Sequence, residues 1–252
     1  MGQPDLKKYL TASSVANEVL RQTLAVVASG ISVHELCSYG DALVQAYAKS
    51  VYRKDASMEK GLACPTTVSV NNLIQNYSPN KDKDYILREG DMVKMYALLI
   101  QLTPTSTPLL MLVGRTSPTV SDDCMPNTYI SGHSEINVHI NGFIASSAHT
   151  IVINSNPSIP VTDRRADAIC AAHFAAEAAL RLFKPGNTSA DVRRAIQMIA
   201  AGFNCHVVDQ TYTAQVDQFV LHGLKTFANR TNPEEAHRPI TFETDEVYTL
   251  DV

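Results

Sequence analysis

The side chains that could do chemistry are scattered along this chain of 252 residues. It contains eight histidines, and none forms a dense cluster with carboxylates at the spacing of metal ligands. Acidic pairs occur at Asp122–Asp123 and Glu234–Glu235, both in loop-like sequence where carboxylates are usually solvated. A glycine-rich nucleotide motif, a serine-hydrolase elbow and a His-Glu-x-x-His zinc motif are all missing. The usual signatures of these classes are therefore excluded.

One strand-like segment places a polar side chain where a ligand could stand. In INGFIASSAHT, residues 140–150, alternation puts Gly142, Ile144 and Ser146 on one face of a predicted strand. The polar residue on that face is a serine, whose neutral hydroxyl is a poor ligand for a divalent cation.

Composition is ordinary for a globular protein. Hydrophobic residues make up 45% and charged residues 18%, and the net charge of -4 gives no overall attraction to nucleic acid. Five scattered cysteines without a Cys-x-x-Cys pair favour a reducing compartment. The start is polar, and no apolar run is long enough to span a membrane. We expect a cytoplasmic location, with the nucleus or nucleolus as a further one, and no membrane partner.

The order of elements predicts an α+β protein of two similar halves. A helix over residues 7–28 is followed by one that begins with a capping box at Ser32, and strands come next. The order then repeats, with an alanine-rich helix stopped by Pro185, a helix capped by Ser189, and further strands. We expect one domain over residues 1–252, with halves at 1–153 and 154–252.

Residues 97–134 interrupt this order. The apolar runs ALLIQL and LLMLV flank the turn-forming TPTSTP, and a polar loop follows. We interpret this segment as an inserted hairpin and loop. Such a hairpin either packs on its own domain or marks an interface.

Successive blocks of the sequence resemble a known fold family. These blocks are KGLACPTTVSVNN, YILREGDMVK, VHINGFIASSAHT, AAHFAAEAALRLFKPGN and FETDEVYTLDV. They are similar to the pita-bread metallopeptidase fold, in particular to the proliferation-associated (ErbB-receptor-binding) proteins, non-peptidase relatives of type 2 methionine aminopeptidase. The resemblance implies two helix-plus-sheet halves around a curved antiparallel sheet. In the active enzymes, two Asp, one His and two Glu hold two divalent cations there.

The resemblance matches each ligand position with a residue of this chain. The first aspartate is matched by Tyr96 or by Glu135, depending on where the insertion starts, and both assignments stay open. The second aspartate is matched by Ser146 and the histidine by Ala214, which has no ligand atom. The first glutamate is matched by Asp251.

The resemblance also matches two histidines that contact substrate in the active enzymes, and only one of them is a histidine here. One histidine of the active enzymes is matched by Asn76, and another is kept as His222. The last glutamate would lie beyond Val252. A dinuclear site needs several anionic ligands, so we expect no metal, no other cofactor and no peptidase activity.

The resemblance implies a protein that acts by binding, as a ribosome- or RNA-associated factor linked to growth or proliferation. Its partners would be the large ribosomal subunit or structured RNA, and regulatory proteins. Candidates for phosphate contact are basic residues, namely Lys7, Lys8, Arg53, Lys54, Lys60, Lys81 and Lys83. The alternatives are a metal-dependent methionine aminopeptidase with a degenerate site, and a regulatory protein- or peptide-binding module.

The end of the chain raises a further expectation. Stopping at DEVYTLDV should leave the second half short of strands and expose unpaired strand edges. We therefore expect a longer natural protein, or a partner or second copy that completes the sheet.

Overall fold

The structure is a computed structural model. It describes residues 3–73, 76–95, 98–101, 109–111, 129–130, 136–156, 158–209, 211–230 and 238–252. For residues 3–4, 95, 98–101, 109–111 and 129–130 the backbone alone is described. Tyr96, Glu135 and most of the expected insertion lie outside the described residues.

Helices occur in two pairs, one in each half of the chain, as the sequence predicted. The described helices are α1 (Gln3–Val26), α2 (Val33–Ser50), α3 (Arg164–Leu182) and α4 (Ser189–Gly202), with a short 3-10 helix η1 (Lys81–Lys83). Antiparallel strands follow each pair, which confirms the α+β class. In the part of the chain that is described, no helix has the length and apolar character needed to cross a membrane.

The strands form small sheets. One sheet has the order β1 (Lys60–Cys64), β7 (Ile136–Ile140), β8 (Phe143–Ser147), and another has β2 (Ser69–Val70), β3 (Met92–Met95), β9 (His149–Val152). A five-stranded sheet has the order β12 (Thr226–Ala228), β11 (Tyr212–Gln215), β13 (Val247–Leu250), β4 (Leu98–Gln101), β5 (Leu109–Met111). A parallel pair joins β10 (His206–Val207) to β6 (Tyr129–Ile130).

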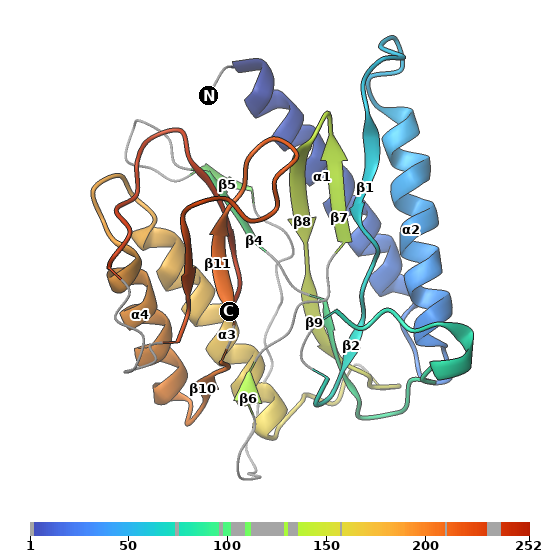
Figure 1. Cartoon of the computed structure of the whole chain (residues 1–252). Coiled ribbons are helices and arrows are strands. Elements are labelled where there is room, and N and C mark those ends of the chain that lie inside the picture. Colours follow the sequence, from blue (N-terminus) through green and yellow to red (C-terminus); the bar gives the residue numbers. More distant parts are fainter. Residues whose placement is uncertain are drawn as a thin grey trace.

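The core of the first half lies between helices and strands. Helix α1 packs against β7 and β8, and α2 packs against β1 (Figure 1). Apolar residues of α1 at helical spacing, such as Ala12, Ala16 and Val19, are fully buried there against Val138 and Ile140. The apolar side of α1 therefore packs against the apolar side of β7. Because β8 pairs with β7, this packing also fixes the position of β8.

The core of the second half depends on small and aromatic side chains. Helices α3 and α4 pack on each other (Figure 1), with Ala171, Ala175 and Ala179 buried on α3. Alanine lets two helices approach closely. Beside them Phe183 stacks on Phe242 with ring centroids 4.7 Å apart. This core supports the sheet that contains β11 and β13.

The predicted helix starts are confirmed at one place and corrected at another. Ser32 is the N-cap of α2, and its hydroxyl accepts a hydrogen bond from the Glu35 amide at 3.1 Å. The prediction that Ser189 caps α4 is wrong, because Thr188 is the N-cap and Ser189 is the first helical residue. The Ser189 hydroxyl instead accepts the Ile240 amide at 3.0 Å. The Ser189 side chain therefore bonds to the segment around Ile240, which is distant in sequence, and does not cap its own helix as the local sequence predicted.

The last described strand, β13, is not at an edge of its sheet. β13 pairs antiparallel with β11 on one side and with β4 on the other. β4 also pairs with β5, so the apolar runs expected to form a hairpin do pair, and they extend the second half's own sheet. The expectation of an unpaired edge is therefore wrong for β13. The bounds 97–134 of the insertion remain a prediction.

Candidate functional site

Ser146 lies in the buried strand β8, directly opposite Asn137 of β7. The Ser146 hydroxyl donates a hydrogen bond to the Asn137 side-chain oxygen at 2.5 Å, and the two residues are 2% and 1% exposed. A buried hydroxyl without a partner would be costly, so this bond satisfies Ser146 inside the protein. The position matched with a bridging aspartate thus holds a neutral pair.

Asn137 is a site residue that sequence reasoning missed. It lies between the fully buried Ile136 and Val138, in a strand whose other side chains are mostly apolar. A polar amide in such a strand was the available signal, since buried amides need internal hydrogen-bond partners. Reading β7 together with β8 would have placed Asn137 beside Ser146.

The two matched ligand positions of the second half, Ala214 and Asp251, lie on or next to neighbouring strands. Ala214 of β11 is buried and stands opposite Thr249 of β13, and Asp251 directly follows β13. A polar chain runs beside them. The Thr213 hydroxyl donates to the Asn229 side-chain oxygen at 2.7 Å, and the Asn229 amide donates to the main-chain oxygen of Asp251. In this pairing Asp251 lies two residues beyond the partner of Ala214.

The substrate-side positions lie on exposed segments. His222 is exposed, on the connection between β11 and β12. Asn76 is also exposed and has a left-handed φ of 55°. Partly buried histidines occur at His139 and His149, and burial lowers the pKa of both below the ordinary value. Burial thus favours the neutral form of both rings.

The described ligand positions do not fit a dinuclear metal centre. Ser146 offers a hydroxyl already bonded to an amide, Ala214 offers no ligand atom, and Asp251 alone is a carboxylate. Within the described ranges, no group of three or more His, Cys, Asp or Glu side chains could hold a metal ion. Two hard cations close together need several shared anionic ligands. This donor set does not supply them.

Lys94 is a second residue without a sequence signal. It is 6% exposed in β3, and its ammonium donates hydrogen bonds to the main-chain oxygens of Asn71 and Leu73. Burial lowers the Lys94 pKa to about 8. The side chain thus fixes the turn after β2, which leads toward Asn76.

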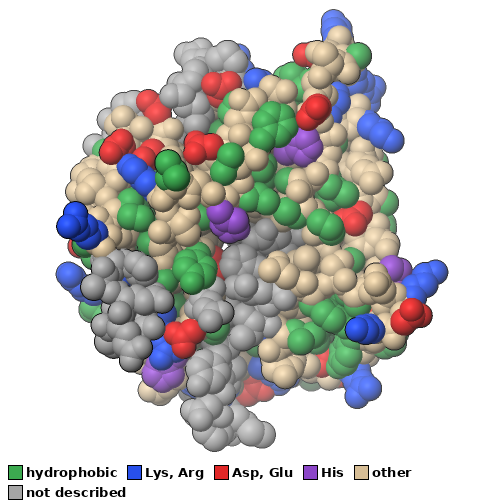
Figure 2. Space-filling model, viewed as in Figure 1, with side chains coloured by type: hydrophobic (Ala, Val, Ile, Leu, Met, Phe, Trp, Pro, Cys, Tyr) green, Lys and Arg blue, Asp and Glu red, His purple; other side chains and the backbone are tan. Residues whose placement is uncertain are grey.

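Most of the basic candidates meet at one end of the first half. The Thr11 hydroxyl lies 3.3 Å from the Tyr52 hydroxyl, which places the start of α1 beside the end of α2. Figure 2 shows Lys and Arg side chains gathered at the upper right, over that end of α2. Arg53, Lys54 and Lys60 lie at this end, where the Lys60 ammonium donates to the main-chain oxygens of Val51 and Tyr52, and Lys7 and Lys8 lie about one helical turn before Thr11. We call these lysines and Arg53 the basic cluster.

Part of the basic cluster also has structural contacts. Lys8 pairs with Asp5 at 3.6 Å and lies 4.8 Å from the centre of the Phe143 ring. The Lys60 ammonium donates to the Val51 main-chain oxygen at 2.6 Å, and Arg53 donates to Ser50 at 3.0 Å. Lys60 and Arg53 therefore stabilise the carbonyl end of α2 as well as adding positive charge.

Lys81 and Lys83 do not join the basic cluster. They form η1, which lies at the other end of α2, because the His34 ring in the first turn of α2 contacts the Pro79 main-chain oxygen at 2.9 Å. A helix of 18 residues is about 27 Å long. The structure therefore separates these lysines from Arg53 and Lys54.

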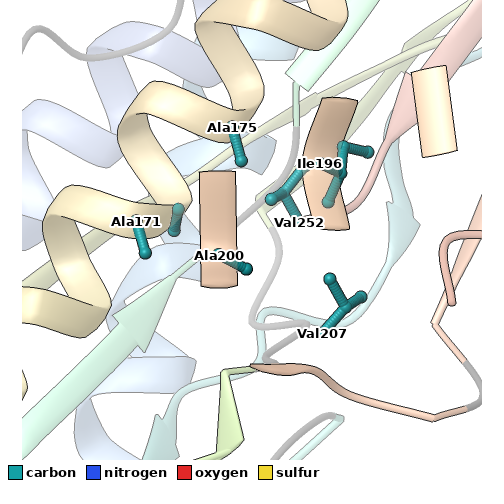
Figure 3. Close-up of a pocket in the computed structure, with 7 residues that line it drawn as sticks. Ala171, Ala175, Ile196, Ala200, Val207 and Val252 are labelled. Atoms are coloured by element: carbon teal, nitrogen blue, oxygen red, sulfur yellow. The ribbon is translucent and has the colours of Figure 1, made fainter. Parts of the chain in front are cut away.

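A cavity between α3 and α4 offers no chemistry. Its volume is about 10 Å³, enough for about one water molecule. Figure 3 shows its apolar lining, with side chains from both helices, from β10 and from the end of the chain. The lining residues are Ala171, Ala172, Ala175, Ile196, Ala200, Val207 and Val252. It is a packing defect and not a ligand pocket.

Comparisons with curated proteins found relatives over nearly the whole chain. Proliferation-associated protein A of Dictyostelium discoideum is 30% identical over 244 residues, which cover 97% of this chain and 53% of that protein. ERBB-3 BINDING PROTEIN 1 of Arabidopsis thaliana is 30% identical over 246 residues, covering 97% and 52%. Probable metalloprotease arx1 of Schizosaccharomyces pombe is 27% identical over 229 residues, covering 85% and 45%. The chain spans about half the length of the curated relatives it matches.

Comparisons with solved structures show the fold. A thermophilic Arx1 superposes with a TM-score of 0.72 at 21% identity, over 98% of this chain and 62% of that one. Methionine aminopeptidase from Rickettsia prowazekii superposes with a TM-score of 0.64 at 14% identity, over 98% and 77%. No protein-family model matches the chain. The architecture is that of the pita-bread aminopeptidases, as the sequence predicted.

Proposed function

Because this chain is a relative of the proliferation-associated proteins and has the pita-bread fold of the methionine aminopeptidases, we propose that it acts by binding and not by cleaving peptides. The fold alone does not decide between these functions, because one fold hosts catalytic and non-catalytic members. The chemistry of the ligand positions supports binding.

One observation carries this proposal. Ser146 replaces a bridging carboxylate, and its hydroxyl is already bonded to Asn137 in a buried neutral pair. A metal ion at this place would have to break that bond and would gain a weak neutral ligand. Ala214, which is matched with the histidine ligand, has no side-chain ligand atom that could make up for the lost carboxylate.

The proposed partner is the large ribosomal subunit, contacted through its RNA. The basic cluster at the meeting point of α1 and α2 supports this choice, because clustered cations attract phosphate groups. Lys81 and Lys83 lie about one helix length away, so they are excluded from the same contact. A cytoplasmic or nuclear location belongs to the same proposal.

Metal content and peptide cleavage test the loss of catalysis. The protein is incubated with excess Co²⁺ or Mn²⁺, dialysed, and assayed for bound metal and for cleavage of a methionyl peptide. An active methionine aminopeptidase treated in parallel is the control. We expect no stoichiometric metal and no turnover. Bound metal together with turnover would show that this chain is an enzyme, as the name of the arx1 relative suggests for that protein.

Ribosome co-sedimentation across a salt series tests the partner. We expect the double variant Arg53→Ala/Lys54→Ala to weaken binding and to reduce the salt dependence by about 1 in log–log slope for each phosphate that is no longer neutralised. Lys81→Ala/Lys83→Ala removes the same charge from the other end of α2 and should bind like the unaltered protein. Salt-insensitive binding would point to a protein partner instead, and equally weakened binding in both variants would count against the basic cluster.

A further inference from the structure

The connection between β11 and β12 links the two halves of the molecule. Residues 216–225 extend from the second half to the turn between β7 and β8 in the first half, as the orange loop at the upper end of β8 in Figure 1 shows. This turn consists of Asn141 and Gly142. We call residues 216–225 the strap.

The root of the strap is firmly held. Val216 is buried among the apolar residues of the first-half core, although it belongs to the second half. Its amide donates to the Val247 main-chain oxygen at 2.8 Å, and its own oxygen accepts the hydroxyl of the buried Tyr9 at 3.4 Å. Moving Val216 would therefore disturb both a core and a sheet.

The tip of the strap is a tight turn, in which the Asp217 and Val220 amides each donate to the other's main-chain oxygen at 3.0 Å. It contacts the first half through exposed groups, including a Phe219 ring whose centre lies 6.4 Å from the centre of the His139 ring. The Phe219 amide donates to the Gly142 oxygen at 2.7 Å, and the Gln218 side-chain amide donates to the Asn141 oxygen at 2.8 Å. The Phe219 ring lies on Gly142 so closely that a Cβ atom there would stand 2.4 Å from it. Glycine is required at this position, because its φ is 77° as well.

The tip also has features that oppose closure. Phe219 has a left-handed φ of 61°, which is unfavourable for a bulky aromatic residue. Its side chain is 58% exposed, so little apolar burial compensates for this backbone. Hydrogen bonds at such an exposed place contribute little net stability, since water can replace them. Closure of the tip is therefore only weakly favoured.

We propose that the strap is a conformational device with a fixed root and a releasable tip. The tip opens while Val216 stays in the first-half core, so neither half unfolds. Opening frees the adjacent main-chain acceptors of Asn141 and Gly142, and the apolar ring of Phe219, at the junction of the halves. A partner that supplies main-chain donors and an apolar side chain would favour the open form, because it binds that form alone.

Amide hydrogen exchange resolved by residue tests this device. In the unaltered protein we expect the Phe219 amide to exchange at least about tenfold faster than the Val216 amide, because a local opening exposes one and not the other. Equal rates for both amides would overturn the proposal, since the strap would then open only when the whole protein unfolds.

The variant Gly142→Ala should hold the tip open. Its Cβ would clash with the Phe219 ring, so we expect faster exchange at Phe219 and an unchanged rate at Val216. Gly186→Ala is the matched control, because Gly186 has a φ of 92° and no atom within 4 Å of an added Cβ. Alanine at residue 186 is strained by the positive φ but meets no neighbouring atom, so this variant should leave exchange in the strap unchanged.

A second variant keeps the test decisive if Gly142→Ala does not fold. Phe219→Ala removes the ring that packs on Gly142 and keeps a residue for which the left-handed backbone is unfavourable. Exchange at residue 219 should again rise at least about tenfold while Val216 keeps its rate. A rise at both residues would overturn the separate movement of tip and root.

Discussion

At the scale of single residues, the centre of this fold is closed by neutral hydrogen bonds. Ser146 and Asn137 satisfy each other, and Asn229 connects Thr213 to the main chain at Asp251. In the metal enzymes of this fold, cations would balance carboxylates at such positions. Here Asp251 is the one carboxylate among the described ligand positions, and a hydrogen bond within the protein holds Ser146, so we expect the stability of β8 not to depend on metal ions.

The Ser146–Asn137 pair gives a direct stability prediction. Ser146→Ala should lower the free energy of unfolding by about 1–3 kcal/mol, because Asn137 loses a buried hydrogen bond. Urea unfolding measures this change. The control Ser14→Ala, on the exposed side of α1, should stay within about 0.5 kcal/mol of the unaltered protein. A Ser146→Ala variant as stable as the control would show that the pair contributes nothing.

Lys94 gives a prediction about pH. Its folded-state pKa of about 8 lies below the ordinary value of 10.5, so the unfolded chain binds more protons between these values. The free energy of unfolding should therefore rise with pH across this window, by up to about 3 kcal/mol from this group. Below pH 8 the contribution of Lys94 should be constant.

Comparison with Lys94→Met isolates this effect from other groups that titrate in the same range. The variant keeps the apolar stem and removes the ammonium, so the rise between pH 8 and 10.5 should be smaller in it. Urea unfolding at several pH values for both proteins measures the difference. Parallel curves would contradict a lowered Lys94 pKa.

At the scale of elements, the helices were predictable and the strand partners were not. Helical spacing and the Ser32 cap located α1 and α2, because both signals are local. The partner of β13 is β4, far away in sequence, and no local pattern encodes that pairing. Asn137 was missed although its partner Ser146 is only nine residues away on the adjacent strand, because the two strands were not compared side by side. The matched positions Ser146, Ala214 and Asp251 came from resemblance and stay a prediction.

The pairing of β4 with β13 can be tested by one substitution. Ile100 stands opposite Tyr248 in β13 and opposite Leu110 in β5. Ile100→Pro removes a ladder donor from a strand with neighbours on both sides, so hydrogen exchange in β13 should become at least about tenfold faster. Ile100→Val is the control and should keep slow exchange. Unchanged protection in the proline variant would argue against this sheet order.

At the scale of the whole molecule, the halves share a core and should unfold together. Val247 belongs to β13 of the second half, yet it packs among the first-half residues around Val138. Val247→Ala should lower the free energy of unfolding by about 2 kcal/mol and accelerate exchange in both β7 and β11. Val220→Ala, at a partly exposed position, is the control. Acceleration confined to β11 would mean that the halves unfold separately.

The contact between Tyr9 and Val216 has a consequence for how the protein is made. These residues are 207 positions apart, and Val247 completes the same core even later. At about 5–20 residues per second, translation separates them by about 10–40 s. Most partners of α1 lie in α2, β7 and β8 and are made early, but the core around Tyr9 lacks Val216 and Val247 until the end of that interval. The first-half core should therefore become complete only after β13 has been synthesised.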